Sequence, residues 1–387
     1  MTADLTEKYP HLLFRTHWAV SSPIMFLLGQ CQAYVKAICD TSILPENHQK
    51  LLNVSLVRGA HATTAIEGNT LTEEDIERIQ RGHNLPPSRA YQEIEVRNVI
   101  DAYNELLQEV VYKNEISKIT PDLIKRLHVL VSKGLGVHLD AIPGQFRTDF
   151  RVVGRYRCPD YADVASLVET MCDWLYREFN FGSGNQQFWQ VVIQSIVAHV
   201  YLEWIHPFGD GNGRTGRLLE FYILLRGSLP DIASHIMANH YNNTRSEYYR
   251  QLDNARIKRD LTEFIGYALQ GLHDGLEETL KTIQQSQFII TWHKYIYDRF
   301  ADVKMSHKEV FKRRRELILS MPTDRGLALE ELLDSSPRIA RMYAKLSIRS
   351  INRDADELIK LGLARKESGR YFANAQLVSG FLAQKRN

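Results

Sequence analysis

The stretch Ile205-His206-Pro207-Phe208-Gly209-Asp210-Gly211-Asn212-Gly213-Arg214-Thr215-Gly216-Arg217-Leu218-Leu219 separates two long helical patterns and decides how this part of the chain folds. Its three glycines at positions 211, 213 and 216 let the backbone turn tightly and point N–H groups inward. The next helix is expected to begin near Arg214, so the positive end of its dipole faces the same place. The segment therefore predicts a turn that can cradle an anion.

Charged and titratable side chains complete this predicted anion site. Arg214 and Arg217 are three residues apart, so they lie on one face of the following helix and suit a polyphosphate. Asp210 supplies a hard oxygen ligand beside them, which suits Mg²⁺ carried on phosphates. His206 is the nearby group that titrates close to neutral pH, which suits a general base.

A plain surface turn is the simplest alternative, since Gly-Asp-Gly-Asn-Gly is a common turn sequence. A Walker phosphate loop does not fit, because no Gly-Lys-Ser/Thr follows. An EF-hand does not fit either, because its acidic positions and closing glutamate are missing. The combination of base, carboxylate, glycines and two arginines in one short segment favours a phosphate site over the plain turn.

Residues 206–217 match in full the signature H-x-F-x-[D/E]-G-N-[G/K]-R-x-x-R, and through it the chain resembles the Fic family. The resemblance extends from about residue 60 to about residue 275 and includes Pro143–Arg147 and Tyr248–Leu252. It implies a helical Fic core that binds ATP and transfers AMP to a protein hydroxyl. Such a protein is a nucleotidyltransferase, and the reaction is AMPylation.

The resemblance gives a role to each matching position. His206 would deprotonate the hydroxyl of a target Tyr, Thr or Ser, which would attack the α-phosphate while pyrophosphate leaves. Asp210 would hold Mg²⁺, Phe208 would anchor the loop in the core, and Arg217 would hold the γ-phosphate. The other residues expected to line the anion hole are Gly211, Asn212, Gly213 and Arg214.

A β-hairpin is expected at Phe150–Arg157, which gathers β-formers around a glycine. This hairpin resembles the flap of the Fic family, which clamps the target segment by β-strand addition and covers the nucleotide. An ordinary surface hairpin is the alternative. The tyrosine pair expected near the adenine is Tyr248 and Tyr249. The flap residues expected near ATP are Val153, Gly154, Arg155 and Tyr156.

A second motif lies upstream, where Thr63-Thr64-Ala65-Ile66-Glu67-Gly68 fits the family's inhibitory pattern [S/T]-x-x-x-E-[G/N]. Glu67 placed against Arg217 would form a charge-assisted pair and keep Arg217 from the γ-phosphate. The resemblance therefore predicts autoinhibition by a helix of the same chain, with Thr63 and Gly68 as the other motif positions. A solvated glutamate at a helix end is the alternative. In some relatives this glutamate also helps to remove AMP from the target. Both addition and removal of AMP are compatible with the sequence.

The helical pattern divides the chain into three predicted regions, and the expected fold class is mainly α. Residues 1–110 form a helical region with the inhibitory motif, residues 111–285 the Fic core with its hairpin flap, and residues 303–387 a C-terminal winged helix-turn-helix domain. Besides a helix that starts at Thr72, helices are expected at about 20–45, 48–67, 90–113, 120–134, 161–179, 186–205, 214–226, 244–257, 260–287, 308–320, 327–334 and 347–361.

The formal net charge of +2 conceals two oppositely charged parts. Residues 303–387 hold 18 Lys and Arg against 10 Asp and Glu, whereas the rest of the chain holds 30 against 36. The C-terminal region is therefore the one part of the chain for which nucleic acid is a candidate partner. The alternative function of this region is to bind a protein. The basic residues expected to meet phosphates are Arg349, Arg353, Lys360, Arg365, Lys366 and Arg370.

The composition, 44% hydrophobic and 24% charged, is that of a globular protein and excludes wholesale disorder. Four cysteines without a C-x-x-C pair argue against a zinc ribbon or a disulfide scaffold. The first eight residues carry acids and no apolar core, so we expect no signal peptide, and no apolar run is long enough for a membrane helix.

The resemblance to the Fic family implies an autoinhibited protein adenylyltransferase that uses ATP and Mg²⁺, and the composition places it in the cytoplasm. Its expected partners are ATP and the side-chain hydroxyl of a target protein. Self-modification and a homodimer are further implications of the resemblance. A DNA-binding regulator that acts through the winged helix, and an enzyme that removes AMP, are the alternatives.

Overall fold

The computed structural model describes residues 2–179, 187–233, 235–302 and 307–378. The chain divides into two compact units, Met1–Leu280 and Lys281–Asn387. The region predicted as a winged helix, residues 303–387, begins and ends at positions that lie outside the described residues.

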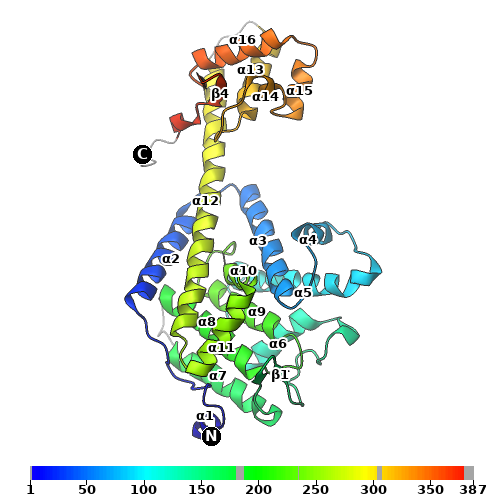
Figure 1. The fold of residues 1–387 in the computed structure, drawn as a ribbon, viewed down its shortest axis with the longest axis vertical. Coiled ribbons are helices and arrows are strands. Elements are labelled where there is room, and N and C mark those ends of the chain that lie inside the picture. The colour runs from blue at the N-terminus through cyan, green and yellow to red at the C-terminus, as the bar shows by residue number, and fades with distance from the viewer. Residues whose placement is uncertain (1, 180–186, 234, 303–306, 379–387) are drawn as a thin grey trace. The chain divides into compact units, whose positions relative to one another are not determined.

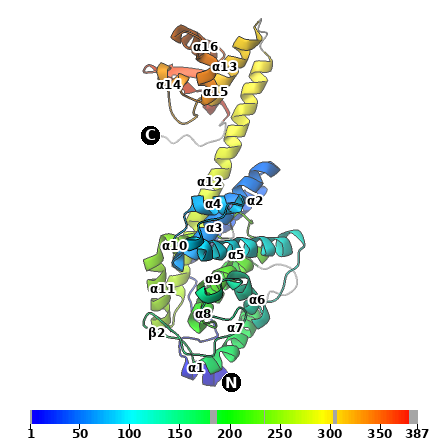
Figure 2. The same cartoon turned by 90° about the vertical axis from the view of Figure 1, so that its right-hand side faces the viewer.

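The first unit is built almost entirely from α-helices, which confirms the mainly α fold class (Figure 1). Figures 1 and 2 place α8 and α9 side by side in the middle of this unit. α8 is apolar around its whole circumference and nearly every residue is buried, as expected of a central helix. The helices are α1 (Thr2–Lys8), α2 (Ser22–Asp40), α3 (Pro45–Ile66), α4 (Glu73–Gln80), α5 (Ala90–Leu107), α6 (Pro121–Ser132), α7 (Val164–Glu178), α8 (Phe188–Ile205), α9 (Asn212–Arg226), α10 (Ile236–Asn243), α11 (Arg245–Lys258) and α12 (Thr262–Ala301).

Side-chain and backbone caps explain several of these helix ends. The Thr72 side chain accepts from the backbone N–H of Asp75, whose carboxylate accepts in return from Thr72, so the predicted capping box is present. The Thr120 hydroxyl caps α6 by accepting from the backbone N–H of Leu123 at 3.1 Å. At the end of α3, Gly68 has a φ of +99°, a left-handed conformation in which a side chain would be strained.

Two short strands form the expected hairpin, β1 (Val152–Val153) and β2 (Tyr156–Arg157), paired antiparallel across Gly154 and Arg155. A π-helical segment, η2 (Gln108–Tyr112), continues α5, and three 3₁₀ turns complete the first unit. These turns are η1 (Pro87–Arg89), η3 (Gly136–His138) and η4 (Tyr161–Asp163).

The second unit contains the last part of α12 and a set of shorter elements. α12 runs to Ala301 rather than ending near residue 287, because Trp292, Ile296 and Phe300 form a stripe that packs into the core of this unit. The shorter elements are α13 (Lys308–Ser320), α14 (Leu329–Leu333), α15 (Pro337–Tyr343), α16 (Ile348–Lys360), β3 (Ala364–Glu367), β4 (Arg370–Ala373) and η5 (Ala375–Val378). The sequence did not predict α15, and the assignment of this unit as a winged helix stays a prediction.

No helix in the described part of the chain combines the length and the hydropathy that a bilayer span requires.

Candidate active site

His206 ends α8 in a left-handed backbone conformation with a φ of 50°, so the chain turns sharply where the predicted base stands. The residue is partly buried, and the loss of solvent around its ring lowers the pKa of His206 to about 4. The imidazole is therefore neutral near pH 7 and has a nitrogen lone pair available for a proton.

Arg147, which the sequence analysis did not assign to the site, holds this turn in place. Its guanidinium is 6% exposed and donates from Nε to the carbonyl of His206 at 2.8 Å. It also donates to the carbonyls of Asp149 at 2.7 Å and Pro159 at 2.5 Å. The backbone N–H of Arg147 donates to Pro207 O at 2.9 Å. One buried side chain thus ties the base to the segments that flank the hairpin.

Phe208 is fully buried, as the anchoring role requires, and it stacks on a histidine that was not predicted. The rings of Phe208 and His128 are 3.8 Å apart and nearly parallel. The backbone N–H of Gly144 donates to His128 Nδ1 at 2.9 Å, so Nε2 carries the proton and donates to the carbonyl of Asp210 at 3.0 Å. Burial lowers the pKa of His128 to about 4, which keeps this neutral tautomer.

Asn212 closes the loop with its side chain. Its Oδ1 accepts from the backbone N–H of Phe208, and its Nδ2 donates to the carbonyl of Phe208, both at 2.9 Å. The residue is 2% exposed, so this amide braces the loop from inside the core. Gly211 precedes α9 with a φ of +78°. The backbone N–H groups in the first turn of a helix have no partner within the helix, which suits an anion.

Arg214 and Arg217 both lie in the first turns of α9, but each meets a different carboxylate. Arg214 is 3% exposed and donates to Glu95 Oε1 at 2.8 Å and to Asp210 Oδ1 at 3.3 Å. Glu95 comes from α5 and was not predicted. The side chain of Asp210 is 38% exposed, and its Oδ1 also accepts from the N–H of Gly211.

The predicted contact between Glu67 and Arg217 is present, with Arg217 Nη2 donating to Glu67 Oε1 at 2.5 Å. Thr63 holds the same guanidinium, since Arg217 Nε donates to its hydroxyl at 2.7 Å and Nη2 to its carbonyl at 2.9 Å. Burial works against ionisation of Glu67, but the adjacent Arg217 outweighs it and holds the pKa of this carboxyl below its usual range.

Two glycines allow this contact. The N–H of Asn69 donates to Thr64 O and that of Gly68 to Ala65 O, a Schellman pattern that ends α3 immediately after Glu67. At Gly213, a Cβ atom would lie 2.2 Å from Glu67 Oε1, so only a glycine lets the carboxylate rest on the first turn of α9. A glutamate is unfavourable at a helix C-terminus, and the ion pair with Arg217 offsets that cost.

Of the flap residues expected near ATP, Val153, Gly154 and Arg155 are exposed, whereas Tyr156 is anchored. The Tyr156 hydroxyl donates to Trp204 O at 2.6 Å and accepts from His11 Nε2 at 2.9 Å. The guanidinium of Arg256 lies over the Tyr156 ring, 4.7 Å from its centre. Tyr156 therefore fastens the hairpin to the end of α8.

The two tyrosines predicted near the adenine have different surroundings. Tyr248 is 1% exposed, and its hydroxyl bonds to His199 Nε2 at 2.9 Å inside the core, so this ring is a packing residue. Tyr249 is 45% exposed, and its hydroxyl donates to Ile66 O at 3.4 Å, next to the motif of Glu67. Of the two rings, only that of Tyr249 is accessible from outside the core.

Two glutamates that interact with Arg217 were not predicted, the buried Glu220 and the partly buried Glu203. Burial raises the pKa of Glu203 to about 7 and that of Glu220 to about 8. The hydroxyl of Tyr241 donates to Glu220 Oε1 at 2.9 Å. The two glutamates belong to no sequence motif. Their proximity is apparent only from the packing of α8 against α9.

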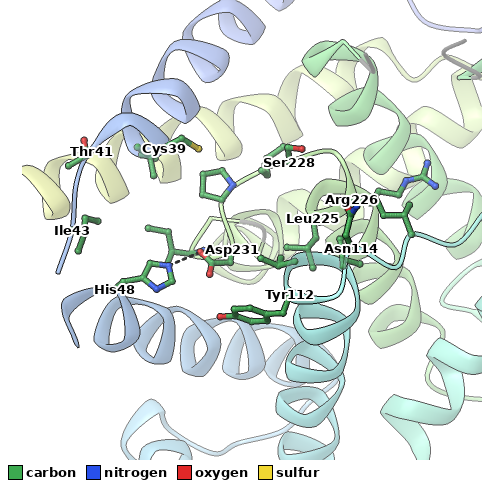
Figure 3. A pocket seen from close by; sticks show the side chains of 17 residues that line it. Cys39, Thr41, Ile43, His48, Tyr112, Asn114, Leu225, Arg226, Ser228 and Asp231 are labelled. Carbon is green, nitrogen blue, oxygen red and sulfur yellow. Dashed lines mark hydrogen bonds and ion pairs between the residues drawn. The ribbon is translucent and has the colours of Figure 1, made fainter. Parts of the chain in front are cut away.

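A separate open pocket of about 650 Å³ lies between the end of α2, the start of α3, η2 and the end of α9 (Figure 3). Its lining includes Tyr112, Leu225 and Pro230, and the pair formed by His48 Nε2 and Asp231 Oδ1 at 3.2 Å. None of the residues from His206 to Arg217 lines it, so it is distinct from the candidate active site.

Residues 118–224 match the Fic/DOC family. Over 226 residues it is 29% identical to protein adenylyltransferase fic-1 of Caenorhabditis briggsae, covering 58% of this chain and 41% of that protein. It is 30% identical over 229 residues to protein adenylyltransferase Fic of Drosophila ananassae, covering 56% and 39% respectively. This chain thus spans about two fifths of the length of the curated relatives it matches.

Solved structures share the fold. A Fic family protein from Desulfovibrio desulfuricans has a TM-score of 0.57 at 20% identity, covering 93% of this chain and 98% of that one. Fic-1 from C. elegans has a TM-score of 0.55 at 24% identity, covering 68% and 73%. The predicted Fic helical core with its hairpin is thereby confirmed.

Proposed function

We propose that this chain is a protein adenylyltransferase that transfers AMP from ATP to a Tyr, Thr or Ser hydroxyl, and that Glu67 holds it inactive. The observation that carries the proposal is the arrangement of His206, the glycine turn and α9, with Arg217 engaged by Glu67 at 2.5 Å. An arginine at the positive end of a helix is suited to bind a phosphate group, and here the carboxylate of Glu67 occupies the arginine instead.

In the proposed reaction, the target hydroxyl oxygen attacks the α-phosphorus of ATP and the bond from that phosphorus to the bridging oxygen breaks. The hydroxyl proton passes to His206, and pyrophosphate leaves with the bond electrons. Arg147 and the αL turn fix the backbone from which the His206 ring projects. The neutral state of His206 near pH 7 leaves it ready to accept the proton.

The backbone N–H groups at the start of α9, together with Arg214 and Arg217, would stabilise the charge on the phosphates. Within the described residues no group of three or more His, Cys, Asp or Glu side chains is placed to hold a metal ion. A single carboxylate is nevertheless what Mg²⁺ uses when substrate phosphates and water supply the other ligands, and the partly exposed Asp210 fits that need. The ion would neutralise charge on the leaving pyrophosphate.

The hairpin is proposed to receive the target. β1 and β2 form a two-stranded sheet, so the outer edges of both strands are without a neighbouring strand among the described residues. An extended target segment can add to such an edge through main-chain hydrogen bonds. Val152 and Val153, at 64% and 44% exposure, offer an apolar surface beside that edge.

The remaining expectations belong to the same proposal. The proposed regions are residues 1–110 with the inhibitory motif, 111–285 as the catalytic core and 303–387 as a winged helix, in a cytoplasmic protein. Modification of the chain by itself and a homodimer are proposed as well.

The test is transfer of label from α-labelled ATP with Mg²⁺ to protein by the full chain and by Glu67→Gly and His206→Ala. The proposal requires Glu67→Gly to label more than wild type and His206→Ala to label nothing. Mass spectrometry of the labelled protein then identifies the modified residue. If wild type instead strips AMP from a target labelled beforehand and Glu67→Gly does not, removal of AMP is the function.

A further inference from the structure

In the basic run Lys312-Arg313-Arg314-Arg315 of the second unit, two arginines bind a buried carboxylate of the same unit. Arg313 Nε donates to Asp354 Oδ2 at 2.7 Å and Arg314 Nε to Asp354 Oδ1 at 2.8 Å. The Tyr343 hydroxyl donates to the same carboxylate at 2.9 Å, and Asp354 is 1% exposed. This cluster fixes α16 against α13 and α15, and it keeps one acid of α16 away from the outer surface.

The outer face of α16 carries two arginines without an acidic partner. Its buried side holds Ile351, Ala355 and Leu358. Arg349 and Arg353 are one helical turn apart and exposed, and among the residues that the structure describes no ion pair engages either of them. Asp356 is the acid nearest to this face along the helix, and its carboxylate accepts from the Asn352 amide at 3.3 Å.

The other basic residues that the sequence offered for phosphate contacts already have partners. Lys360 donates to Glu357 at 2.7 Å, Arg365 to Glu367 at 2.8 Å, and Lys366 to the Tyr371 hydroxyl at 2.8 Å. Arg370 lies 3.4 Å from Glu331 and donates to Gly326 O. The structure therefore divides the six candidates into two free arginines on α16 and four that are engaged.

We propose that the exposed N-terminal half of α16 binds double-stranded DNA, with Arg349 and Arg353 contacting phosphates at the edge of the major groove. An α-helix fits that groove, and α16 follows α15 closely, as a recognition helix follows its preceding helix. Ser347 and Ser350 add hydroxyl groups, and Ile348, at 50% exposure, offers an apolar contact for a thymine methyl. This inference does not rest on the adenylyltransferase proposal.

Duplex DNA is favoured over an acidic protein by the charge of the whole region. The 18 basic against 10 acidic residues in positions 303–387 supply the long-range attraction that a regular polyanion exploits. The pair of free arginines then has the helical spacing needed to meet a regular row of phosphates.

The experiment measures binding of the full chain to a fluorescent duplex of mixed sequence, by anisotropy, over a series of salt concentrations. The test variant is Arg349→Gln with Arg353→Gln. The matched control is Arg365→Gln with Arg370→Gln, which removes the same charge from arginines that already have acidic neighbours. Thermal melting of each variant establishes that it is folded.

Wild type is expected to bind at about 50 mM salt and to weaken steeply as salt rises. The α16 variant is expected to lose affinity on the order of tenfold or more at about 0.1 M salt, and its salt slope should fall by about two. The control should change the slope by clearly less. Labelling from ATP, measured with Glu67→Gly added to each protein, should be the same in all three.

The proposal is overturned if wild type does not bind duplex at low salt, or if the control loses as much affinity as the α16 variant. It is also overturned if the α16 variant binds DNA normally but loses labelling of a protein target, since the face would then be a docking surface for protein. Failure of labelling in every protein would count against the adenylyltransferase proposal and leave the DNA measurement intact.

Discussion

Replacing Glu67 by glycine is the perturbation that tests most directly how this chain is held inactive. The change removes a hydrogen bond of 2.5 Å to an arginine whose side chain is 1% exposed, while Thr63 still holds that guanidinium. Hydrogen bonds to charged groups contribute about 1.5–3 kcal/mol. In wild type, the γ-phosphate must displace Glu67 at this cost before Arg217 can bind it. Since about 1.4 kcal/mol corresponds to a factor of ten, labelling should rise by about 10- to 150-fold.

The assay is the initial rate of label transfer from α-labelled ATP to protein, with ATP affinity measured on the same samples by calorimetry. Glu67→Gln keeps the size of the side chain and loses its charge, so it should give an intermediate rate. Glu73→Gly is the matched control, because Glu73 is an exposed glutamate of the same region. Its ion pair, at 3.8 Å, is with Arg58 and not with a residue of α9. A Glu67→Gly protein that labels no faster than wild type or the control would refute the reasoning.

Most of the fold could be predicted because helix signals are local. Thr72 and Thr120 act through residues three positions away, and both caps are present in the structure. α10 was missed because its eight residues lack a side-chain cap and are held by burial of Ile236, Met237 and Tyr241. Short helices of this kind are stabilised by packing partners rather than by their own sequence.

The candidate site was predictable where one contiguous motif supplies it and unpredictable where distant segments complete it. Glu95, His128 and Arg147 meet the loop across 119, 82 and 59 positions of sequence, and none of them stands in a motif with chemical meaning. Tyr156 was assigned to the nucleotide by position, but its hydroxyl bonds to Trp204 O and His11. A signature thus identifies which residues are near the chemistry, whereas the role of each one depends on what the rest of the chain places beside it.

Three further predictions follow from the interior of the first unit. Because burial lowers the pKa of His206 to about 4, kcat/KM for ATP in Glu67→Gly should stay level from pH 8 to below pH 6; an acid limb at 6.5 would contradict this neutral state. Gly213→Ala would place a Cβ 2.2 Å from Glu67 Oε1, so it should raise labelling in wild type and add nothing to Glu67→Gly; equal losses in both would mean that the methyl group blocks phosphate instead. Glu220→Gln tests the pKa of about 8 that burial gives this carboxyl. Between about pH 5 and 8, a carboxyl whose pKa is raised on folding holds its proton in the folded protein and has lost it in the unfolded protein. The folded protein therefore loses stability as pH rises from the pKa of the unfolded state to the pKa of the folded state. The glutamine cannot ionise, and the free energy of unfolding of Glu220→Gln should therefore gain on wild type by about 1.4 kcal/mol per pH unit across that range, measured by chemical denaturation. A difference that does not change with pH would show that Glu220 is ionised in the native protein, with Arg217 as the positive charge that favours its carboxylate.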